Sequence, residues 1–452
     1  MKKYRLTALI CAALTLGLAG CGGQSSTENS KEDQTASSAA ESSASEQAES
    51  TAETTAAAPA GEPEAIYTPD STWVPADASL GLPEPEANMA TDEMCRRAVL
   101  NVGNTARLAN VMKRAQNKEA ITVACIGGSI TQGTGASSSS DNYAYRSMAW
   151  WVKAFPDAAM KLNYVNAGIG ATGSYIGVHR LERDLLESKP DVVIVEFSVN
   201  DTAPARDLES YDSLVRRILE QDNNPAVVLL HMTQENGTSL YETHKKIGEK
   251  YDLPMISYKN AVLPEIKAGK FTWKDISPDN IHPNSNGHAI TGALLWSYYN
   301  SVLAQLDSID TSDLTFSAEP VGTDRYKNPD IKNSSNITPL ANNNFTETEI
   351  NRNFPHGWSA ETPGAISFEV AAQNIGILYQ RTIDGKSGQY DVYVDGELVK
   401  TLDGNFKGGW GNYAEAAEVY VGEGGGMPHT VMIKMADNSS APGFNLLGLL
   451  VS

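Results

Sequence analysis

The chain has 452 residues, 41% of them hydrophobic and 20% charged, and this length and composition fit two or three folded domains. Its 35 basic and 55 acidic residues give a formal net charge of −20. A chain this acidic repels phosphate backbones, which excludes nucleic acid as an expected partner. Four cysteines are too few for a disulfide scaffold, and their spacing matches no zinc site.

The first residues are typical of an export signal. Basic residues precede an apolar stretch over 6–18, which is too short to cross a bilayer core of about 30 Å. The stretch ends in Leu-Ala-Gly before Cys21, which resembles a bacterial lipobox. We expect a lipoprotein signal peptide over 1–20, lipidation of Cys21, and an exported protein anchored at the extracytoplasmic face of the bacterial cell membrane. An ordinary secretory signal is the alternative.

Residues 21–90 begin with a low-complexity tract of Ser, Thr, Ala and Glu. Such a composition buries no core, and its acidic charges favour an extended chain. We therefore expect a disordered tether over 21–90. Beyond it, Cys95 and Cys125 are expected to be buried free thiols, with a disulfide between them as the alternative.

From 91 to 308, apolar runs alternate with helical patterns. The runs are rich in β-branched residues without polar alternation, as is typical of strands buried on both faces of a parallel sheet. This alternation predicts an open α/β sheet with right-handed crossovers, whose ligand site lies beyond the carboxyl ends of the strands. The expected strands are 121–126, 162–165, 191–197, 226–230 and 254–257, and helices are expected near 142–155, 175–188, 208–221, 239–251, 260–268 and 287–304.

The pattern changes after about residue 310. Helical signals give way to alternating strands, as at 389–394 and 429–435. The pair Asp395-Gly396 between two strand patterns is a strong signal for a β-hairpin. We expect residues 309–452 to form a small β-sandwich of jelly-roll type.

Four loops at the expected carboxyl edge of the sheet carry the groups that acyl transfer needs. Gly-Gly-Ser129 follows the first strand, and the glycine-rich segment 166–173 follows the second. Asn200 follows the third strand, and Asp279 and His282 lie just before the last helix. A serine hydroxyl needs a base, the base needs an orienting carboxylate, and the developing oxyanion needs hydrogen-bond donors.

Each loop taken alone has a simpler interpretation. The serine fits a turn, Asn200 an ordinary loop, and His282 before a proline a turn histidine. A phosphate-binding loop is disfavoured because no Gly-Lys-Ser/Thr follows the glycines. The conjunction of four such loops at one sheet edge favours a hydrolase, since Asp279 and His282 are close enough for one turn to bring them together.

The four loops resemble the four sequence blocks of the SGNH/GDSL hydrolases, over about residues 101–299. The resemblance implies a flavodoxin-like three-layer α/β/α domain and a mechanism without metal or cofactor. It implies that Ser129 is the nucleophile and that its own N–H is the first oxyanion donor. It further implies that the Asn200 amide is a donor, that His282 is the general base, and that Asp279 orients His282.

Two of these blocks depart from the family pattern. The first has Gly-Gly-Ser-Ile where many members have Gly-Asp-Ser-Leu, which leaves the triad intact. The second has Ala171 at the position of the oxyanion glycine. The N–H of Ala171 can serve if φ is negative there; if φ must be positive, Gly170 is expected to be the donor. Both residues remain candidates.

The expected substrate is an acetylated polysaccharide. The resembling family includes acetylesterases of polysaccharides as well as lipases, thioesterases and lysophospholipases. Export and a β-rich domain with aromatics expected at its surface favour carbohydrate. The predicted protein is therefore a serine esterase that removes O-acetyl groups through a Ser-His-Asp triad and an acyl-enzyme. A lipid or lysophospholipid esterase and a catalytically silent glycan-binding lipoprotein are the alternatives. The surface aromatics expected are Trp358, Trp410 and Tyr413.

Further side chains near these loops have more than one interpretation. Tyr143 and Trp273 are candidate walls for a sugar ring, with core packing as the alternative. His231 and His288 are expected to be structural. Glu196 and Asp201 are either acceptors behind the site or solvated carboxylates.

Overall fold

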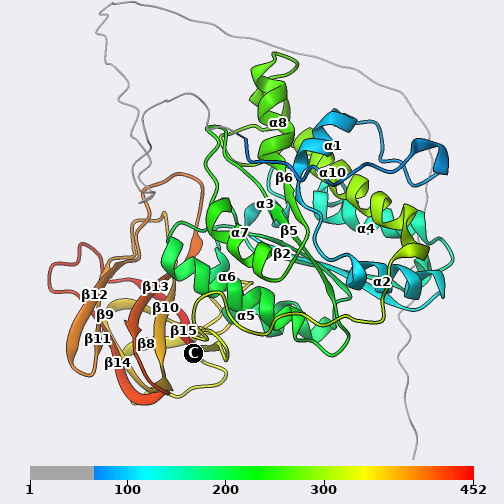
Figure 1. Cartoon of the computed structure of the whole chain (residues 1–452). Coiled ribbons are helices and arrows are strands. Elements are labelled where there is room, and N and C mark those ends of the chain that lie inside the picture. Colours follow the sequence, from blue (N-terminus) through cyan, green and yellow to red (C-terminus); the bar gives the residue numbers. More distant parts are fainter. Residues whose placement is uncertain (1–65) are drawn as a thin grey trace, which may run out of the picture. The chain divides into compact units, whose positions relative to one another are not determined.

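The computed structural model describes residues 66–452, so the expected signal peptide, Cys21 and most of the expected tether lie outside the described residues. In that described range no helix is both long enough and apolar enough to cross a membrane. The described chain folds into an α/β domain followed by an all-β domain, whose strands run from yellow to red in Figure 1.

The α/β domain is built on a six-stranded sheet, within the described residues, of order β1-β6-β5-β4-β2-β3. Strands β2 to β6 are parallel, and β1 pairs antiparallel with β6. This is the flavodoxin-like order, in which the direction of winding reverses beside β2. The sheet strands are β1 (Val99–Asn101), β2 (Ile121–Gly127), β3 (Leu162–Gly168), β4 (Val192–Glu196), β5 (Ala226–His231) and β6 (Met255–Ser257).

Burial distinguishes the central strands from β3. Every residue of β2, β4 and β5 is buried, whereas β3 is largely half-exposed. The expectation that 162–165 is buried on both faces was wrong, because β3 is the edge strand and has a neighbour on one side only.

Helices cover both faces of the sheet (Figure 1). The six expected helices are present as α4 to α8 and α10, whereas α1, α2 and the short helices α3 and α9 were not predicted. Single 3₁₀ turns lie at Ala78–Leu80, Ser139–Asp141, Ala159–Lys161, Leu186–Ser188 and Leu306–Ser308. The helices are α1 (Asp92–Ala98), α2 (Ala106–Gln116), α3 (Ser129–Gln132), α4 (Tyr143–Ala154), α5 (Ser174–Asp184), α6 (Pro204–Leu219), α7 (Tyr241–Lys250), α8 (Tyr258–Lys267), α9 (Trp273–Ile276) and α10 (Ser285–Ala304).

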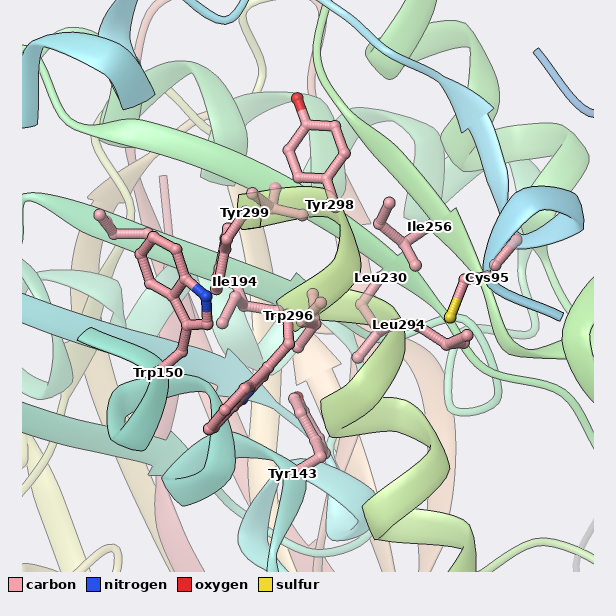
Figure 2. Packing of buried hydrophobic residues seen from close by; sticks show 14 of the residues in the cluster. Cys95, Tyr143, Trp150, Ile194, Leu230, Ile256, Leu294, Trp296, Tyr298 and Tyr299 are labelled. Atoms are coloured by element: carbon pink, nitrogen blue, oxygen red, sulfur yellow. The ribbon is translucent and has the colours of Figure 1, made fainter. Parts of the chain in front are cut away.

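Alternate residues of each central strand point to two separate cores. Ile194 of β4 packs with side chains of α4 and α10, while its neighbour Val195 packs with α5, α6 and α7. Figure 2 shows the first core, where Trp150 and Tyr299 lie beside Ile194. Cys95 and Cys125 are both buried here as free thiols.

Residues 66–90 belong to this domain rather than to a tether. The N–H of Asp70 donates to the carbonyl of Val99 at 2.8 Å, and the indole of Trp73 donates to Ser301 at 3.0 Å. Trp73 is buried in the first core. The expectation of a disordered segment extending to residue 90 was therefore wrong for this stretch. Its proline and acidic residues are typical of a linker, but buried side chains such as Trp73 fix it to the domain.

Residues 309–329 connect the two domains along the α/β surface. Arg107 of α2 donates to the carbonyl of Leu314 at 2.9 Å, and Asp212 of α6 accepts from the N–H of Val321 at 3.1 Å. The first strand of the all-β domain begins at Asp330, and residues of both domains share the second core.

The all-β domain is antiparallel, with the path β12-β11-β14-β9-β15-β10-β13 and with β7 and β8 at its sides. The hairpin at Asp395-Gly396 is confirmed: both residues have positive φ (53° and 88°) between the paired residues Val394 and Glu397. Of the aromatics expected at the surface, Trp358 is fully buried, Trp410 is 59% exposed and Tyr413 is half-buried. The strands are β7 (Asp330–Lys332), β8 (Ala341–Thr348), β9 (Gly357–Ala372), β10 (Asn374–Arg381), β11 (Gln389–Val394), β12 (Glu397–Asp403), β13 (Tyr413–Val421), β14 (Met427–Met435) and β15 (Phe444–Val451).

Candidate active site

Ser129 lies at the point where β2 ends and α3 begins. It is the first residue of α3, with Gly128 as the N-cap, and it is 9% exposed. A Cβ on Gly128 would overlap Oδ1 of Asn200. Glycine at this position therefore allows the loop after β4 to approach the serine loop closely.

Ser129, His282 and Asp279 form a continuous hydrogen-bonded chain. Nε2 of His282 lies 2.9 Å from Oγ of Ser129, and Nδ1 lies 2.8 Å from Oδ2 of Asp279. The second oxygen of Asp279, Oδ1, accepts from the N–H groups of Ile281 and His282 at 2.8 and 2.7 Å. One carboxylate thus orients both the imidazole and the turn that carries it.

These hydrogen bonds keep Asp279 ionised. Burial raises the pKa of its carboxyl, but hydrogen bonds from the backbone and side chain of His282 and from the backbone of Ile281 outweigh burial. The pKa therefore lies below its ordinary value. An ionised carboxylate accepts the Nδ1–H of His282, which leaves Nε2 free to accept a proton.

Trp273 supports this turn from behind. Its indole N–H donates to the carbonyl of Asp279 at 2.6 Å, and Oγ of Ser277 lies 2.7 and 2.6 Å from the carbonyl oxygens of Asp279 and His282. Trp273 is only 6% exposed, so its predicted role as a wall for a sugar ring was wrong. Burial of this tryptophan leaves no polar atom unpaired, because its indole N–H has a hydrogen-bond partner in the core.

Tyr143 has a comparable position under the serine loop. Its ring is 0% exposed, and its hydroxyl lies 2.7 Å from Oγ1 of Thr131 in α3. The predicted contact with a sugar ring was wrong here too. His288 contacts the same loop: Nδ1 accepts from the N–H of Tyr143 at 3.4 Å, and Nε2 lies 3.2 Å from the carbonyl of Thr134.

The amide of Asn200 faces the serine loop. Its Oδ1 is buried against Gly128, and its Nδ2 makes no hydrogen bond within residues 66–452. An amide nitrogen without a partner in the described residues, beside the loop that carries Ser129, is available to an incoming carbonyl oxygen.

The two candidate oxyanion donors in the glycine-rich loop after β3, Gly170 and Ala171, differ in whether their N–H groups are already engaged. The N–H of Gly170 donates to Oε1 of Gln132 at 2.8 Å, so its single proton is already engaged. Ala171 has a φ of 59°, in the left-handed region, so the condition of a negative φ is not met. In the part of the chain that the structure describes, the N–H of Ala171 has no hydrogen-bond partner. The loop lies beside Ser129, because a Cβ on Gly170 would be 3.8 Å from Cβ of Ser129.

Sequence reasoning missed Gln132 and the partners of Asp201. Oδ1 of Asp201 accepts from the N–H of Ser174 at 2.7 Å, and Oδ2 lies 2.9 Å from Nε2 of His244. Both side chains are fully buried, so Asp201 is not a solvated carboxylate. The one sign of this contact in the sequence is Gly173, where a Cβ would clash with Oδ1 of Asp201.

Two more buried groups lie behind this loop. Burial raises the pKa of Glu196 to about 8, although the N–H and hydroxyl of Ser198 donate to its Oε1. His231 is 1% exposed, and its ring nitrogens make no hydrogen bond within the described residues. Among residues 66–452, no group of three or more His, Cys, Asp and Glu side chains could hold a metal ion.

A cleft of about 790 Å³ lies beside the end of β3, and none of Ser129, Asn200 and His282 lines it. Gly168 and Ile169 line it on one side, and residues of the all-β domain line it on the other. Its wall carries charged and amide side chains. These include Arg183, Glu187, Asn333, Arg352, Asn353 and His356.

Comparison with known proteins agrees with this geometry. The family model of the GDSL-like lipase/acylhydrolase family matches residues 125–290. Two crystal structures of a two-domain esterase active on acetylated mannans, one co-crystallised with mannopentaose, share 31% and 32% identity with the chain, with TM-scores of 0.72 and 0.71. The alignments cover 79% of this chain and 97% and 98% of the esterase. No curated protein matches the chain.

An identity above 30% over nearly the whole length of that esterase, together with the matched acylhydrolase segment, defines the class of this protein. The chain belongs to the GDSL-like lipase/acylhydrolase family. It is a carboxylic ester hydrolase that joins an SGNH-type α/β domain to an antiparallel β-sandwich domain.

Proposed function

We propose that this hydrolase removes O-acetyl groups from an acetylated polysaccharide, with Ser129 as nucleophile, His282 as general base and Asp279 as the carboxylate that orients the base. The observation that carries the proposal is the chain of hydrogen bonds from Asp279 through His282 to Ser129, at 2.8 and 2.9 Å. It occurs in a chain that is 31% identical to an esterase active on acetylated mannans.

The first step forms an acyl-enzyme. Oγ of Ser129 attacks the acetyl carbonyl carbon while Nε2 of His282 takes the hydroxyl proton. The C=O electron pair moves to oxygen, and the resulting oxyanion accepts hydrogen bonds from Ser129 N–H and from Nδ2 of Asn200. When the C–O bond to the sugar breaks, His282 returns the proton to the departing sugar oxygen. Acetyl-Ser129 remains.

Water completes the reaction by the same route. His282 removes a proton from the water, the hydroxide oxygen attacks the acetyl carbon, and Ser129 departs with the proton from His282. Asp279 stays ionised throughout, since its function is to stabilise the imidazolium formed in each step.

We assign the third oxyanion donor to the N–H of Ala171. The N–H of Gly170 is engaged by Gln132, whereas the N–H of Ala171 has no partner within the described residues. The left-handed φ of Ala171 is the conformation that a glycine would adopt without strain, and it costs an alanine about 1 kcal/mol. A side chain as small as a methyl group is tolerated there.

The cleft and an exposed aromatic pair support a carbohydrate substrate. Arginine and asparagine side chains in the cleft wall can form hydrogen bonds with the hydroxyl groups of sugars. On the all-β domain, the rings of Trp410 and Tyr413 lie 4.8 Å apart, and Trp410 is 59% exposed. We propose that this pair contacts sugar rings, because aromatic faces pack on the C–H groups of carbohydrates.

Export and anchoring remain part of the proposal. We propose a signal peptide over 1–20, lipid attachment at Cys21, and a tether that ends before residue 66, where the folded domain begins. An extracytoplasmic location suits an enzyme whose substrate is a polymer. Replacing Cys21 with serine is expected to move the protein from the membrane fraction to the soluble fraction; retention in the membrane fraction would contradict the anchor.

The decisive experiment is acetate release from acetylated mannan, xylan and pectin, together with a series of aryl esters of increasing acyl length. We expect acetate from at least one polymer and a steep fall in kcat/KM beyond about two to four carbons. Activity that rises with acyl length and is absent on every polymer would replace this proposal with a lipid esterase.

A further inference from the structure

We propose that Asp201, held by His244, is a positioning residue that fixes the two loops carrying the oxyanion donors relative to each other. This inference rests on the proposed function, because it assumes that Asn200 and Ala171 are donors to the oxyanion. It concerns a buried carboxylate–imidazole contact that touches neither the substrate nor the triad.

Asp201 caps the start of α5 from a different loop. The N-cap of α5 is Gly173, which has no side chain to accept from the first turn of the helix. Oδ1 of Asp201 accepts from the N–H of Ser174 at 2.7 Å instead. A carboxylate from another loop thus acts as the helix cap and offsets the positive end of the helix dipole. A Cβ on Gly173 would clash with this oxygen.

The position of this contact in the chain links it to both proposed donors. Asp201 follows Asn200 directly, and Ser174 is three residues beyond Ala171. The N–H groups of Asn200 and Asp201 both donate to the carbonyl of Phe197, which closes the turn after β4. One carboxylate therefore ties the segment of one proposed donor to the segment of the other.

The carboxylate of Asp201 is itself held in place by α7. Nε2 of His244 in α7 lies 2.9 Å from Oδ2 of Asp201, and both side chains are 0% exposed. In the tautomer of His244 that carries its proton on Nε2, the imidazole donates to this carboxylate oxygen. The ring of Tyr211 stacks on His244 at 3.8 Å with an interplanar angle of 5°, which fixes the orientation of the imidazole. Three helices, α5, α6 and α7, are thereby joined behind the oxyanion site.

The chemical consequence is a selective effect on turnover. Oxyanion donors stabilise the transition state more than the ground state, so displacing them lowers kcat more than it changes KM. A displacement of about 1 Å costs up to about 10²-fold in rate. A residue that only stabilised the fold would lower the melting temperature and leave kcat of the folded enzyme unchanged.

The test compares Asp201→Asn with Asp212→Asn in the full chain. Asp212 is a matched control, because it is also buried and also accepts from one side chain and one backbone N–H, those of Tyr251 and Val321. We expect Asp201→Asn to lower kcat about 10- to 100-fold on an aryl acetate with little change in KM. We expect Asp212→Asn to affect stability only. Equal kcat values for the two variants would overturn the proposal.

Two further variants separate the positioning effect from simple loss of structure. His244→Gln retains an N–H near the position of Nε2 and should keep most of kcat, whereas His244→Phe should lower it. The losses of Asp201→Asn and Asn200→Ala should also be coupled, so that the double variant loses less than the product of the two. Independent, multiplicative losses would contradict the positioning role. If Ser129→Ala and Asn200→Ala themselves kept activity, the proposed function would fail instead.

Discussion

The two sides of the proposed catalytic site, the acid–base side and the oxyanion side, are built in different ways. On the acid–base side, Asp279 and His282 lie three residues apart, and one carboxylate holds both the imidazole and its turn. On the oxyanion side, the proposed donors come from separate loops that are joined by contacts between residues 27, 38 and 43 positions apart. The first side is a local motif, whereas the second depends on the whole α/β fold.

This difference predicts how each side fails. Loss of one group in the local motif should abolish most of the catalysis, because no other residue can replace the base or its orienting carboxylate. Loss of one group on the distributed side should leave the other donors in place and reduce the rate by less.

The largest effect is expected from Asp279→Asn. The amide N–H of asparagine donates to Nδ1 of His282, where the carboxylate accepted. It therefore favours the tautomer with the proton on Nε2, which cannot take a proton from Ser129. We expect kcat to fall about 10⁴-fold with folding unaffected. Asp275→Asn, which changes an exposed helix-capping carboxylate nearby, should keep full activity. Steady-state kinetics on an aryl acetate measure both variants, and a loss below tenfold for Asp279→Asn would contradict the role of this carboxylate.

A smaller effect is expected from Asn200→Ala. Removal of one oxyanion donor costs about 10²- to 10³-fold in kcat while the serine remains reactive. Asn236→Ala, in an exposed loop after β5, is the matched control and should retain kcat. If Asn200→Ala keeps most of the turnover number, the amide is not a donor.

Substitutions at Ala171 should change the rate by less still. Ala171→Gly keeps the N–H and relieves the strain of a φ of 59°, so kcat should be retained with a small gain in stability. Ala171→Val places a β-branched residue in the left-handed region at an expected cost of about 1–3 kcal/mol and should lower both stability and kcat. Thermal unfolding and kinetics of the two variants test this. An active and stable Ala171→Val variant would show that the left-handed backbone conformation at 171 does not restrict the side chain.

At Glu196 no effect on kcat is expected, and the prediction concerns stability alone. The pKa of its carboxyl is raised by burial to about 8 in the folded protein, above its ordinary value in the unfolded chain. The unfolded chain therefore releases this proton first, and the contribution of Glu196 to stability falls as pH rises from about 4.5 to about 8. In Glu196→Gln this slope should be reduced. Melting temperatures measured across that pH range decide the matter, and parallel profiles would refute the raised pKa.

Most of the fold was predictable from periodicity. The β-branched runs of β2, β4 and β5 lack alternation because helices bury both faces, and six helical patterns between them correspond to helices in the structure. The same reasoning misjudged β3, since position at a sheet edge is a property of strand order and not of composition. Residues 66–90 were misjudged because a few buried side chains, such as Trp73, fix a segment whose composition is otherwise typical of a linker.

The acid–base side and the oxyanion side of the site also differ in how much of each could be predicted from the sequence. The spacing of Asp279 and His282 suggested their contact because one turn spans it. The engagement of Gly170 by Gln132 and the pairing of Asp201 with His244 could not be read from the sequence, because they depend on how loops from different strands meet. Burial of Tyr143 and Trp273 depends likewise on long-range packing, which a single aromatic residue in a sequence does not reveal.

The central claim is that Ser129 removes acetyl groups from a polysaccharide. The most direct test measures initial rates of acetate release from acetylated mannan by the wild-type chain, Ser129→Ala and Ser137→Ala. Ser137 is an exposed serine of the neighbouring loop that contacts Ser285, so its variant controls for substitution of a nearby hydroxyl. We predict rapid release by the wild type and Ser137→Ala and none above background by Ser129→Ala. Release by Ser129→Ala at the wild-type rate would contradict the account.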